Sequence, residues 1–250
     1  MNIQFRHSSI EFNDYWDILG IVESNLANVY RTDLIEPGFI VLDLGAGIGD
    51  FTIVASQSVG DFGKVLAIEP NPNDFKQLVN NLQRNHCTNV IPVNVGISNT
   101  NSIDTIEFKN QSFKVNFLRL QDVIDEHGIT RFDFIKMDVE GFERSIVEDS
   151  MRLVENSRYI SMEIHGGQKE LESILERHGY LPERLKSSTI KLNLLRYALK
   201  HPLVSLRIYS IVRKIEGYSP VAIVNRFIRD FHITDEERLM VVTFISNDRR

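Results

Sequence analysis

The sequence predicts an α/β fold in which helices cover both faces of a mainly parallel β-sheet. Short apolar segments rich in β-branched residues alternate with longer segments of helical periodicity, a pattern typical of βαβ units. A glycine-rich turn follows one of the first apolar segments, and acidic residues follow several others. A length of 250 residues and an apolar content of 42% suffice for one substantial core, with or without an added subdomain.

The chain divides into four segments. Residues 1–36 are predicted to be a helical lead-in, because their apolar residues lie at helical spacing before a Pro-Gly break. Residues 37–186 are expected to form the α/β core. A basic helical insertion is predicted over 187–237, and the final strand and tail over 238–250.

Within the core, β-branched apolar runs predict strands and longer amphipathic segments predict helices. The expected strands span residues 39–44, 64–69, 90–95, 132–138, 159–164 and, after the insertion, 239–244. The expected helices span residues 49–58, 72–85, 120–127, 141–154 and 168–178. Two short extended runs, 103–108 and 114–118, predict an edge hairpin.

The net charge of −6 is unevenly distributed. Residues 187–231 contain eight Lys or Arg against two acidic residues, so this segment carries +6 and the rest of the chain −12. Apolar residues at helical spacing on both sides of Pro202 predict two or three amphipathic helices. Such helices suit packing on the acidic body, a substrate lid, a homo-oligomer interface, or contact with an anionic lipid or polymer.

Features of the whole chain favour a cytoplasmic protein. No segment approaches the roughly 20 apolar residues of a membrane span, and the first residues do not resemble a signal peptide. The single cysteine, Cys87, cannot form an internal disulfide, which fits a reducing compartment. Peripheral membrane contact through the basic helices remains open.

The most informative motif is the turn at residues 43–49, which has the pattern D-x-G-x-G-x-G, with Glu69 ending the next strand. Glycines permit close approach of a ligand, and an acid at the end of the second strand can accept hydrogen bonds from ribose hydroxyls. A dinucleotide turn has the pattern G-x-G-x-x-G, and the carboxylate of Asp43 would repel its pyrophosphate. A nucleoside cofactor with a cationic end, S-adenosylmethionine, suits the acidic turn better.

We therefore predict a cofactor site formed by the turn and the ends of the first three strands. Asp43 balances the cationic end of the cofactor, Glu69 holds the ribose, and Asn94 lies beside the adenine. The full set of predicted cofactor-binding residues is Asp43, Gly45, Ala46, Gly47, Gly49, Glu69, Pro70 and Asn94.

A second group of polar residues follows the fourth and fifth strands. Side chains alternate along a strand, so Lys136 and Asp138 share one face, as do Glu163 and His165. Glu140 lies at the following strand-to-helix turn, where it either caps the helix or joins the site. These strand ends meet at one edge of the sheet, so the side chains are expected to converge beside the cofactor.

The predicted catalytic residues are Asp138, Lys136, His165 and Glu140. Asp138 or His165 would serve as general base, with Lys136 steadying a developing alkoxide. Asp138, Glu163 and His165 also have the chemistry of divalent-metal ligands, but we favour a mechanism without metal.

The chain resembles the FkbM-type family of S-adenosylmethionine-dependent methyltransferases. The resemblance rests on residues 41–52, 67–72 and 133–143, of which the Lys-x-Asp-Val-Glu-Gly string is the most family-specific. It implies a Rossmann-like class I sheet of seven strands, mainly parallel with the last strand antiparallel. It also implies O-methylation of a hydroxyl on a sugar, lipid or other small acceptor. The family commonly has Thr-Leu-Asp where this chain has Arg119-Leu120-Gln121, and the basic insertion lies outside the family core.

Three other functions fit parts of the sequence. A transfer-RNA methyltransferase fits the glycine turn and the basic insertion, but the fourth strand lacks the Asn- or Asp-Pro-Pro-aromatic clamp typical of enzymes that methylate nitrogen. An NAD-linked oxidoreductase and a non-catalytic binding module are the alternatives of another class. A small-molecule acceptor is favoured over nucleic acid.

Overall fold

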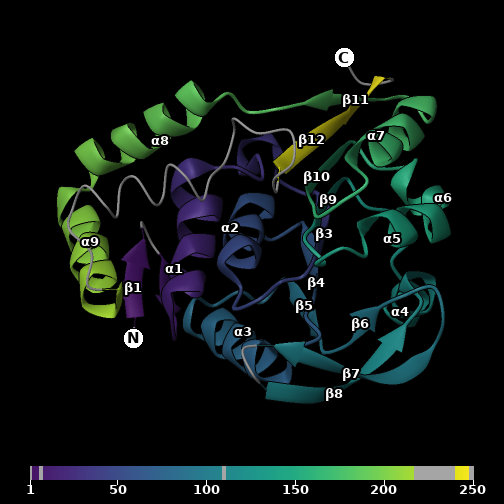
Figure 1. Ribbon diagram of the computed structural model, residues 1–250, viewed down its shortest axis with the longest axis horizontal. Coiled ribbons are helices and arrows are strands. Elements are labelled where there is room, and N and C mark those ends of the chain that lie inside the picture. Colours follow the sequence, from purple (N-terminus) through teal and green to yellow (C-terminus); the bar gives the residue numbers. More distant parts are fainter. Residues whose placement is uncertain (1, 6–7, 109–110, 217–239, 248–250) are drawn as a thin grey trace.

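The computed structural model describes residues 2–5, 8–108, 111–216 and 240–247. At its centre is a seven-stranded sheet (Figure 1). The strands are β3 (Ile40–Leu44), β4 (Lys64–Ile68), β5 (Val90–Val93), β9 (Phe134–Met137), β10 (Tyr159–Ile164), β11 (Tyr180–Glu183) and β12 (Met240–Ser246). Their order is β11-β12-β10-β9-β3-β4-β5, and β12 runs antiparallel to both of its neighbours. The expected parallel sheet with an antiparallel last strand is confirmed.

Helices cover both faces of this sheet, as the sequence predicted. Alternate residues of β3 separate the two cores, because Val41 packs into one apolar cluster and Leu42 and Leu44 into the other. The first cluster includes α2 (Asp50–Val59) and α3 (Pro72–Arg84). The second includes the helices α4 (Leu120–Glu126), α5 (Glu143–Asp149), α6 (Met151–Val154) and α7 (Gln168–Arg177).

Local sequence signals explain the helix boundaries next to the site. Gly49 has a left-handed φ of 93° immediately before α2, and Gly60, φ 65°, follows its last residue. The side chain of Asn71 accepts a hydrogen bond from the backbone N–H of Asn73, and Pro72 occupies the first position of α3. These caps fix the points at which β3 and β4 turn into helices.

The N-terminal segment differs from the predicted helical lead-in. It begins with a hairpin, β1 (Asn2–Phe5) and β2 (Ser8–Glu11), before α1 (Tyr15–Ile21), the π-helix η1 (Val22–Ala27) and the short 3₁₀ helix η2 (Thr32–Leu34). The helical periodicity correctly indicated α1. The hairpin was missed because β2 is held by side chains of α3, a contact that local periodicity does not report.

Three further elements differ from expectation. The hairpin of β7 (Ser102–Phe108) and β8 (Gln111–Leu118) joins β6 (Gly96–Ile97) in a separate three-stranded sheet instead of forming an edge of the main one. The helix predicted over 141–154 begins at Glu143 and is divided at Ser150 into α5 and α6. β11 was not predicted, because its four residues include Pro182 and lack an alternating pattern.

The basic segment forms two helices, α8 (Ser187–Lys200) and α9 (Pro202–Glu216), separated at Pro202 as expected. They lie along one margin of the molecule beside α1 and β1 (Figure 1). The remainder of the predicted insertion, 217–237, lies outside the described residues. In the described part of the chain, no helix combines the length and hydrophobicity needed to cross a membrane.

Candidate active site

The glycine turn between β3 and α2 leaves space for a ligand and brings two strands together. Gly45 and Gly47 have φ of 76° and 52°, a region that favours glycine. A Cβ on Gly45 would lie 1.8 Å from the carbonyl oxygen of Asp138, so only glycine fits there. A Cβ on Gly47 would meet nothing within 4 Å. The turn is therefore packed tightly against the end of β9 at Gly45 and faces an open cavity at Gly47.

Glu69 follows β4 and holds the glycine turn by a direct hydrogen bond. Its Oε2 accepts a hydrogen bond of 2.7 Å from the backbone N–H of Gly47, and its Oε1 one of 2.8 Å from that of Asn71. Burial raises the pKa of Glu69 to about 7, although these two hydrogen bonds favour the ionised form. A buried carboxylate with lone pairs directed along a cavity wall is suited to accept hydrogen bonds from ligand hydroxyls.

The cavity has a volume of about 480 Å³ and lies between the two sheets. One side is formed by Gly45, Gly47, Glu69 and Pro70 from the turn and β4. The lining from the three-stranded sheet and the turn after β9 is mostly apolar, with Glu107 and Glu140 as its acidic members. Its apolar residues are Val95, Ile97, Ile106, Phe117, Val139 and Phe142. Nothing in the sequence pattern indicated that the 103–118 hairpin would reach this site. A polar side with a ribose-type acceptor facing an apolar side fits a nucleoside.

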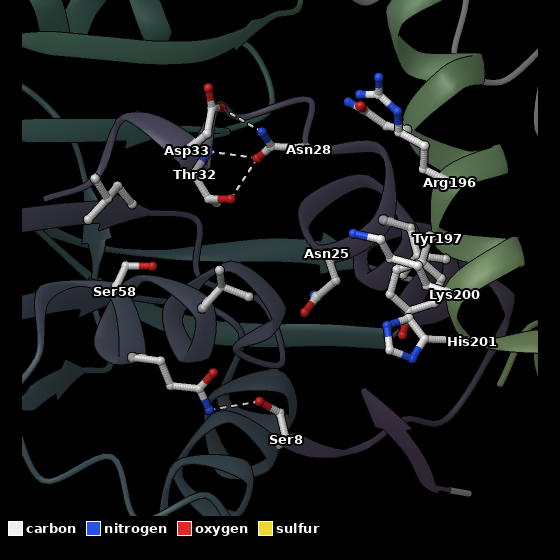
Figure 2. Close-up of a pocket in the computed structure, with 15 residues that line it drawn as sticks. Ser8, Asn25, Asn28, Thr32, Asp33, Ser58, Arg196, Tyr197, Lys200 and His201 are labelled. Carbon is white, nitrogen blue, oxygen red and sulfur yellow. Dashed lines mark hydrogen bonds between the residues drawn. The ribbon is translucent and has the colours of Figure 1, made fainter. Parts of the chain in front are cut away.

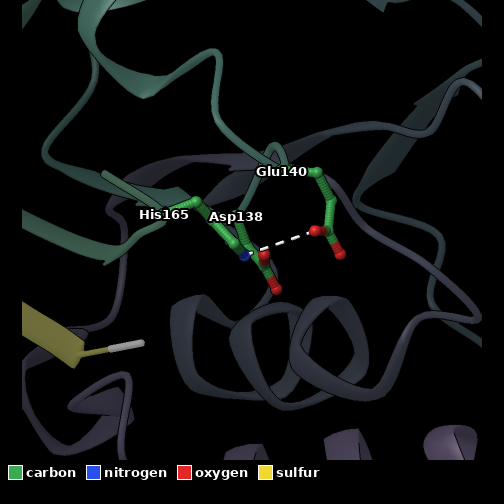
Figure 3. A group of neighbouring side chains, drawn as sticks. All are labelled: Asp138, Glu140 and His165. Carbon is green, nitrogen blue, oxygen red and sulfur yellow. Dashed lines mark ion pairs between the residues drawn. The ribbon is translucent and has the colours of Figure 1, made fainter. Parts of the chain in front are cut away.

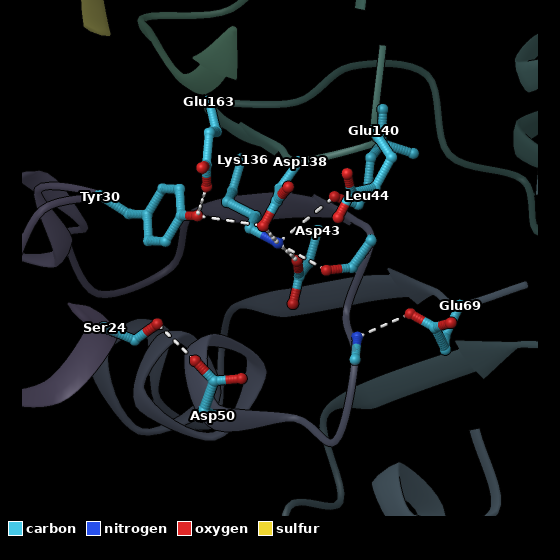
Figure 4. Close-up of polar contacts among 12 residues, drawn as sticks. Ser24, Tyr30, Asp43, Leu44, Asp50, Glu69, Lys136, Asp138, Glu140 and Glu163 are labelled. Carbon is cyan, nitrogen blue, oxygen red and sulfur yellow. Dashed lines mark hydrogen bonds and ion pairs between the residues drawn. The ribbon is translucent and has the colours of Figure 1, made fainter. Parts of the chain in front are cut away.

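Asp43 does not line this cavity. Its side chain is fully buried, its Oδ2 accepts a hydrogen bond of 2.6 Å from Thr52, and its Oδ1 lies 3.4 Å from Nζ of Lys136. Lys136 also donates to the carbonyl oxygen of Gly45 at 2.5 Å (Figure 4). Burial tends to lower the pKa of Lys136, but the charges of Asp43 and its acidic neighbours raise it above its ordinary value. Asp43 thus acts on the turn through Lys136, and its predicted role in balancing the cationic end of a cofactor stays a prediction.

Asp138 joins the cavity to a buried cluster of acids around Lys136. It lines the cavity, and its Oδ2 lies 3.8 Å from Nζ of Lys136 and 3.1 Å from the hydroxyl of Tyr30. The same hydroxyl lies 2.9 Å from Oε2 of Glu163 (Figure 4). A phenol carries one proton, so it can donate to only one of the two carboxylates, and the other contact requires a protonated acid.

The pKa values in this cluster agree with a shared proton. Burial, together with the charge of Asp138, raises the pKa of Glu163 to about 7. Burial and the same acidic neighbours raise the pKa of Glu23 well above its ordinary value, and burial raises that of Asp50 to about 6. The N-terminal segment supplies Glu23 and Tyr30, which sequence reasoning missed, because nothing local links residues so far from β9 and β10.

His165 lies beyond β10 between two glutamates. Its Nδ1 lies 2.8 Å from Oε1 of the buried Glu143, and its Nε2 lies 3.4 Å from Oε2 of the exposed Glu140. Burial alone would lower the pKa of His165, but the hydrogen bond with Glu143 and the charges of Glu163, Glu143 and Glu140 raise it to about 9. The imidazole is therefore protonated at neutral pH and has no free lone pair to accept a proton, which disfavours His165 as the base.

The possible metal ligands that lie together in the structure are not the three that the sequence predicted. Asp138, Glu140 and His165 each offer one ligand atom within 4.8 Å of the others (Figure 3). Glu163, predicted to be the third member, instead faces Tyr30. Glu140 does not cap α5; it has a left-handed φ of 51°, and it is Glu143 that accepts a hydrogen bond from the N–H of Gly141. Whether this group takes a metal stays a prediction.

Three other predicted residues act on the backbone near the cavity. Asn94 donates to the carbonyl oxygens of Glu69 and Pro70 and is itself outside the cavity, whose wall is formed instead by the following residues. Ala46 donates its N–H to the carbonyl oxygen of Ile68, and Gly49 packs against Leu78. Neither lines the cavity.

A second cavity of about 700 Å³ is lined by residues of both η1 and α8 (Figure 2). Its lining is polar and includes Asn25, Asn28, Arg196, Lys200 and His201. None of the glycine-turn residues, and none of the acids around Lys136, takes part in it.

Comparison with known proteins identifies the chemistry. The sequence model of the methyltransferase FkbM domain matches residues 43–182, more than half of the chain. This chain belongs to the FkbM methyltransferase family. The matched region runs from the glycine turn to β11 and contains both the cavity residues on the main sheet and Lys136, Asp138 and His165.

This FkbM methyltransferase has relatives among characterised proteins and solved structures. It is 23% identical to the hexuronic acid methyltransferase AglP of Haloferax volcanii over 172 residues, covering 63% of this chain and 68% of AglP. It is 26% identical to the methyltransferase sdnD of Sordaria araneosa over 189 residues, covering 56% of this chain and 73% of sdnD. A solved S-adenosylmethionine-dependent methyltransferase from Aquifex aeolicus has a TM-score of 0.44 at 17% identity. The match covers 70% of this chain and 92% of the Aquifex chain.

Proposed function

We propose that this S-adenosylmethionine-dependent methyltransferase transfers the methyl group to a hydroxyl oxygen of a sugar or similar small acceptor, with Asp138 as the general base. The observation that carries the proposal is the position of Asp138, which lines the cofactor-sized cavity and also contacts the buried acidic cluster. A donor in the cavity and an acceptor beside the cluster would meet at Asp138.

The donor is expected to lie along the glycine turn, with its ribose on Glu69 and its adenine on the apolar side. When bound, S-adenosylmethionine supplies an activated methyl group, so most of the acceleration comes from holding the acceptor oxygen in line with it. Lys136 contributes by fixing Gly45 through its carbonyl oxygen. Asp43 contributes by keeping Lys136 charged.

The acceptor is expected to be a neutral hydroxyl group. A hydroxyl must lose its proton as it attacks, and Asp138 is placed to accept it. Tyr30 then bridges Asp138 to Glu163 and can pass the proton on. The match to a hexuronic acid methyltransferase supports a sugar as the acceptor class.

The cofactor half of the proposal is tested by calorimetry. S-adenosylmethionine should bind, NAD should not, and Glu69→Gln should weaken binding about tenfold or more, the value of a lost charge-assisted hydrogen bond. Because the folded pKa of Glu69 is about 7 and the ionised form is the acceptor, wild-type affinity should rise as pH increases through 7, and the variant should lose that dependence. Glu176→Gln, on the exposed side of α7, is the matched control. Equal affinity of wild type and Glu69→Gln would refute the assignment.

The acceptor half is tested by transfer of labelled methyl to a panel of neutral sugars and uronic acids, with and without a chelator. Asp138→Asn should lower kcat by about 10²-fold or more while leaving S-adenosylmethionine affinity nearly unchanged. Retention of kcat in Asp138→Asn would remove Asp138 as the base. Loss of activity with chelator, restored by a divalent cation, would assign Asp138, Glu140 and His165 to a metal and replace the base mechanism.

A further inference from the structure

The helices α8 and α9 expose five leucines on their outer surface. The exposed fractions are 43% for Leu192, 55% for Leu195, 74% for Leu199, 81% for Leu203 and 62% for Leu206. The first three recur at intervals of three and four residues and so share one side of α8. The last two lie on the side of α9 opposite to the buried Ile208. We call these five residues the leucine face.

The leucine face is not needed to hold the helices on the body of the protein. That role belongs to other residues, because Ile190, Tyr197 and Ile208 are buried in the core cluster that also contains α1 and α2. At 100° per residue, Leu195 and Leu199 lie on the side of α8 opposite to Ile190 and Tyr197. The helix thus has two apolar sides, and only one is covered in the described structure. An exposed apolar surface of this kind marks an interaction site.

Basic residues flank the leucine face on both sides. Lys191 lies on one side of the α8 leucines, and Arg196 and Lys200 lie on the other; all three are exposed. Among the described residues, none of the three forms an ion pair. Arg207 adds an exposed cation next to Leu206. The chain as a whole has a net charge of −6, so this concentration of positive charge is a local feature.

We propose that the leucine face and its flanking cations dock this methyltransferase on a lipid bilayer that contains anionic head groups. Leucines on the outer side of a helix, with Lys and Arg along both flanks, have the arrangement of helices that lie in the plane of a membrane interface. The leucines enter the acyl boundary while the cations pair with head-group phosphates. A protein partner would need a matching groove, whereas a bilayer accommodates five leucines spread over two helices.

The polar cavity beside α8 supports the same orientation. Arg196 and Lys200 line it together with Asn25 and Asn28, so the flank of the leucine face continues into a cavity with hydrogen-bonding groups (Figure 2). When the leucines are embedded, this cavity opens at the level of the head groups. The docking surface is independent of the acceptor proposed above.

The test is co-sedimentation of the purified full chain with vesicles. We expect binding to phosphatidylcholine vesicles that contain roughly one third phosphatidylglycerol, little binding to pure phosphatidylcholine, and weaker binding as salt is raised. The triple variant Leu199→Gln, Leu203→Gln, Leu206→Gln and the triple variant Lys191→Gln, Arg196→Gln, Lys200→Gln should each lower the partition coefficient about tenfold or more. Circular dichroism establishes that each variant is folded.

The matched control variants remove the same kinds of side chain at other places on the surface. Phe62→Gln with Ile103→Gln removes two exposed apolar side chains, and Lys169→Gln with Arg177→Gln removes two exposed cations; neither pair should change vesicle binding. The proposal is overturned if wild type does not sediment with anionic vesicles or if the leucine variant binds as well as wild type. It is also overturned if sedimentation velocity shows a dimer that the leucine substitutions dissociate, which would assign the face to a second copy of the chain.

Discussion

Lys136 is the residue on which the geometry of the site depends. It is 5% exposed, and it contacts Asp43, Asp138 and the carbonyl oxygen of Gly45. A buried ammonium group is tolerated only when opposite charge and hydrogen bonds surround it. Asp43 supplies the nearest fully buried charge and therefore sets both the stability and the position of the lysine.

We expect Asp43→Asn to lower the free energy of unfolding by about 3 kcal/mol, because it leaves a buried cation without its main partner. The double variant Asp43→Asn with Lys136→Met should recover a large part of this loss, since the uncompensated charge is gone. Urea denaturation of the four proteins in the cycle measures both effects. A double variant less stable than Asp43→Asn would show that Lys136 is stabilised mainly by its other contacts.

At the residue scale, the sequence predicted where side chains lie on the strands better than which residues they contact. Strand alternation correctly placed Lys136 and Asp138 on one side at the end of β9, where their charged groups lie 3.8 Å apart. The glycine pattern correctly predicted a turn with positive φ at Gly45 and Gly47. It did not show that Asp43 turns toward Lys136 and away from the cavity. The orientation of a buried acid depends on which charge is nearest in three dimensions, and that charge comes from another strand.

At the scale of elements, the N-terminal hairpin is attached to α3 by two asparagine side chains. Asn81 accepts from the N–H of Glu11 at 2.8 Å and donates to the carbonyl oxygen of Glu11 at 3.0 Å, and Asn85 makes the equivalent pair with Ser9. Asn81 also donates to the carbonyl oxygen of Ile48 in the glycine turn at 2.9 Å. One fully buried amide therefore joins β2, α3 and the cofactor turn.

Asn81→Leu should destabilise the protein by about 2–3 kcal/mol, because it leaves buried groups of Glu11 and Ile48 without hydrogen-bond partners. It should also weaken cofactor binding, since the glycine turn loses one support. Asn80→Leu, on the exposed side of the same helix, is the control and should change stability by less than about 0.5 kcal/mol. Thermal denaturation and calorimetry measure the two effects, and equal stabilities of Asn81→Leu and Asn80→Leu would contradict the assignment.

The strands and helices of the core could be predicted because their period, length and boundary residues all agree. β3, β4, β9, β10 and β12, with α2, α3 and α7, lie within a few residues of the expected ranges. Elements that depend on distant contacts could not. β2 needs Asn81 and Asn85, and β11 needs β12, which follows it by more than fifty residues.

At the scale of the whole molecule, several buried carboxyls bind protons more tightly in the folded state than in the unfolded chain. The pKa values are about 6 for Asp50 and about 7 for Glu69 and Glu163, and that of Glu23 is also raised. A raised folded pKa adds stability that is present at low pH and is lost as pH rises through the folded value. His165, with a pKa of about 9, acts in the same direction between its ordinary value and 9.

The ligand-free protein should therefore have a lower melting temperature at pH 8 than at pH 6. Each raised pKa unit corresponds to about 1.4 kcal/mol at most, so a shift of several degrees is expected for a chain of this size. Glu163→Gln should flatten the profile, whereas Glu176→Gln should not. A melting temperature that rises from pH 6 to pH 8 would contradict the raised pKa values.

Tyr30 and Glu23 precede residue 43, where the match to the FkbM domain begins. The residues proposed to hold the methyl donor therefore lie inside the matched region. Tyr30, whose hydroxyl contacts Asp138 and Glu163, and Glu23, whose pKa is raised by burial and by the charges of both acids, come from the segment in front of it. We therefore expect that replacing the segment ahead of β3 in this chain would change acceptor preference with no change to donor chemistry. Chimaeras joined just ahead of β3 offer a route to retarget the enzyme.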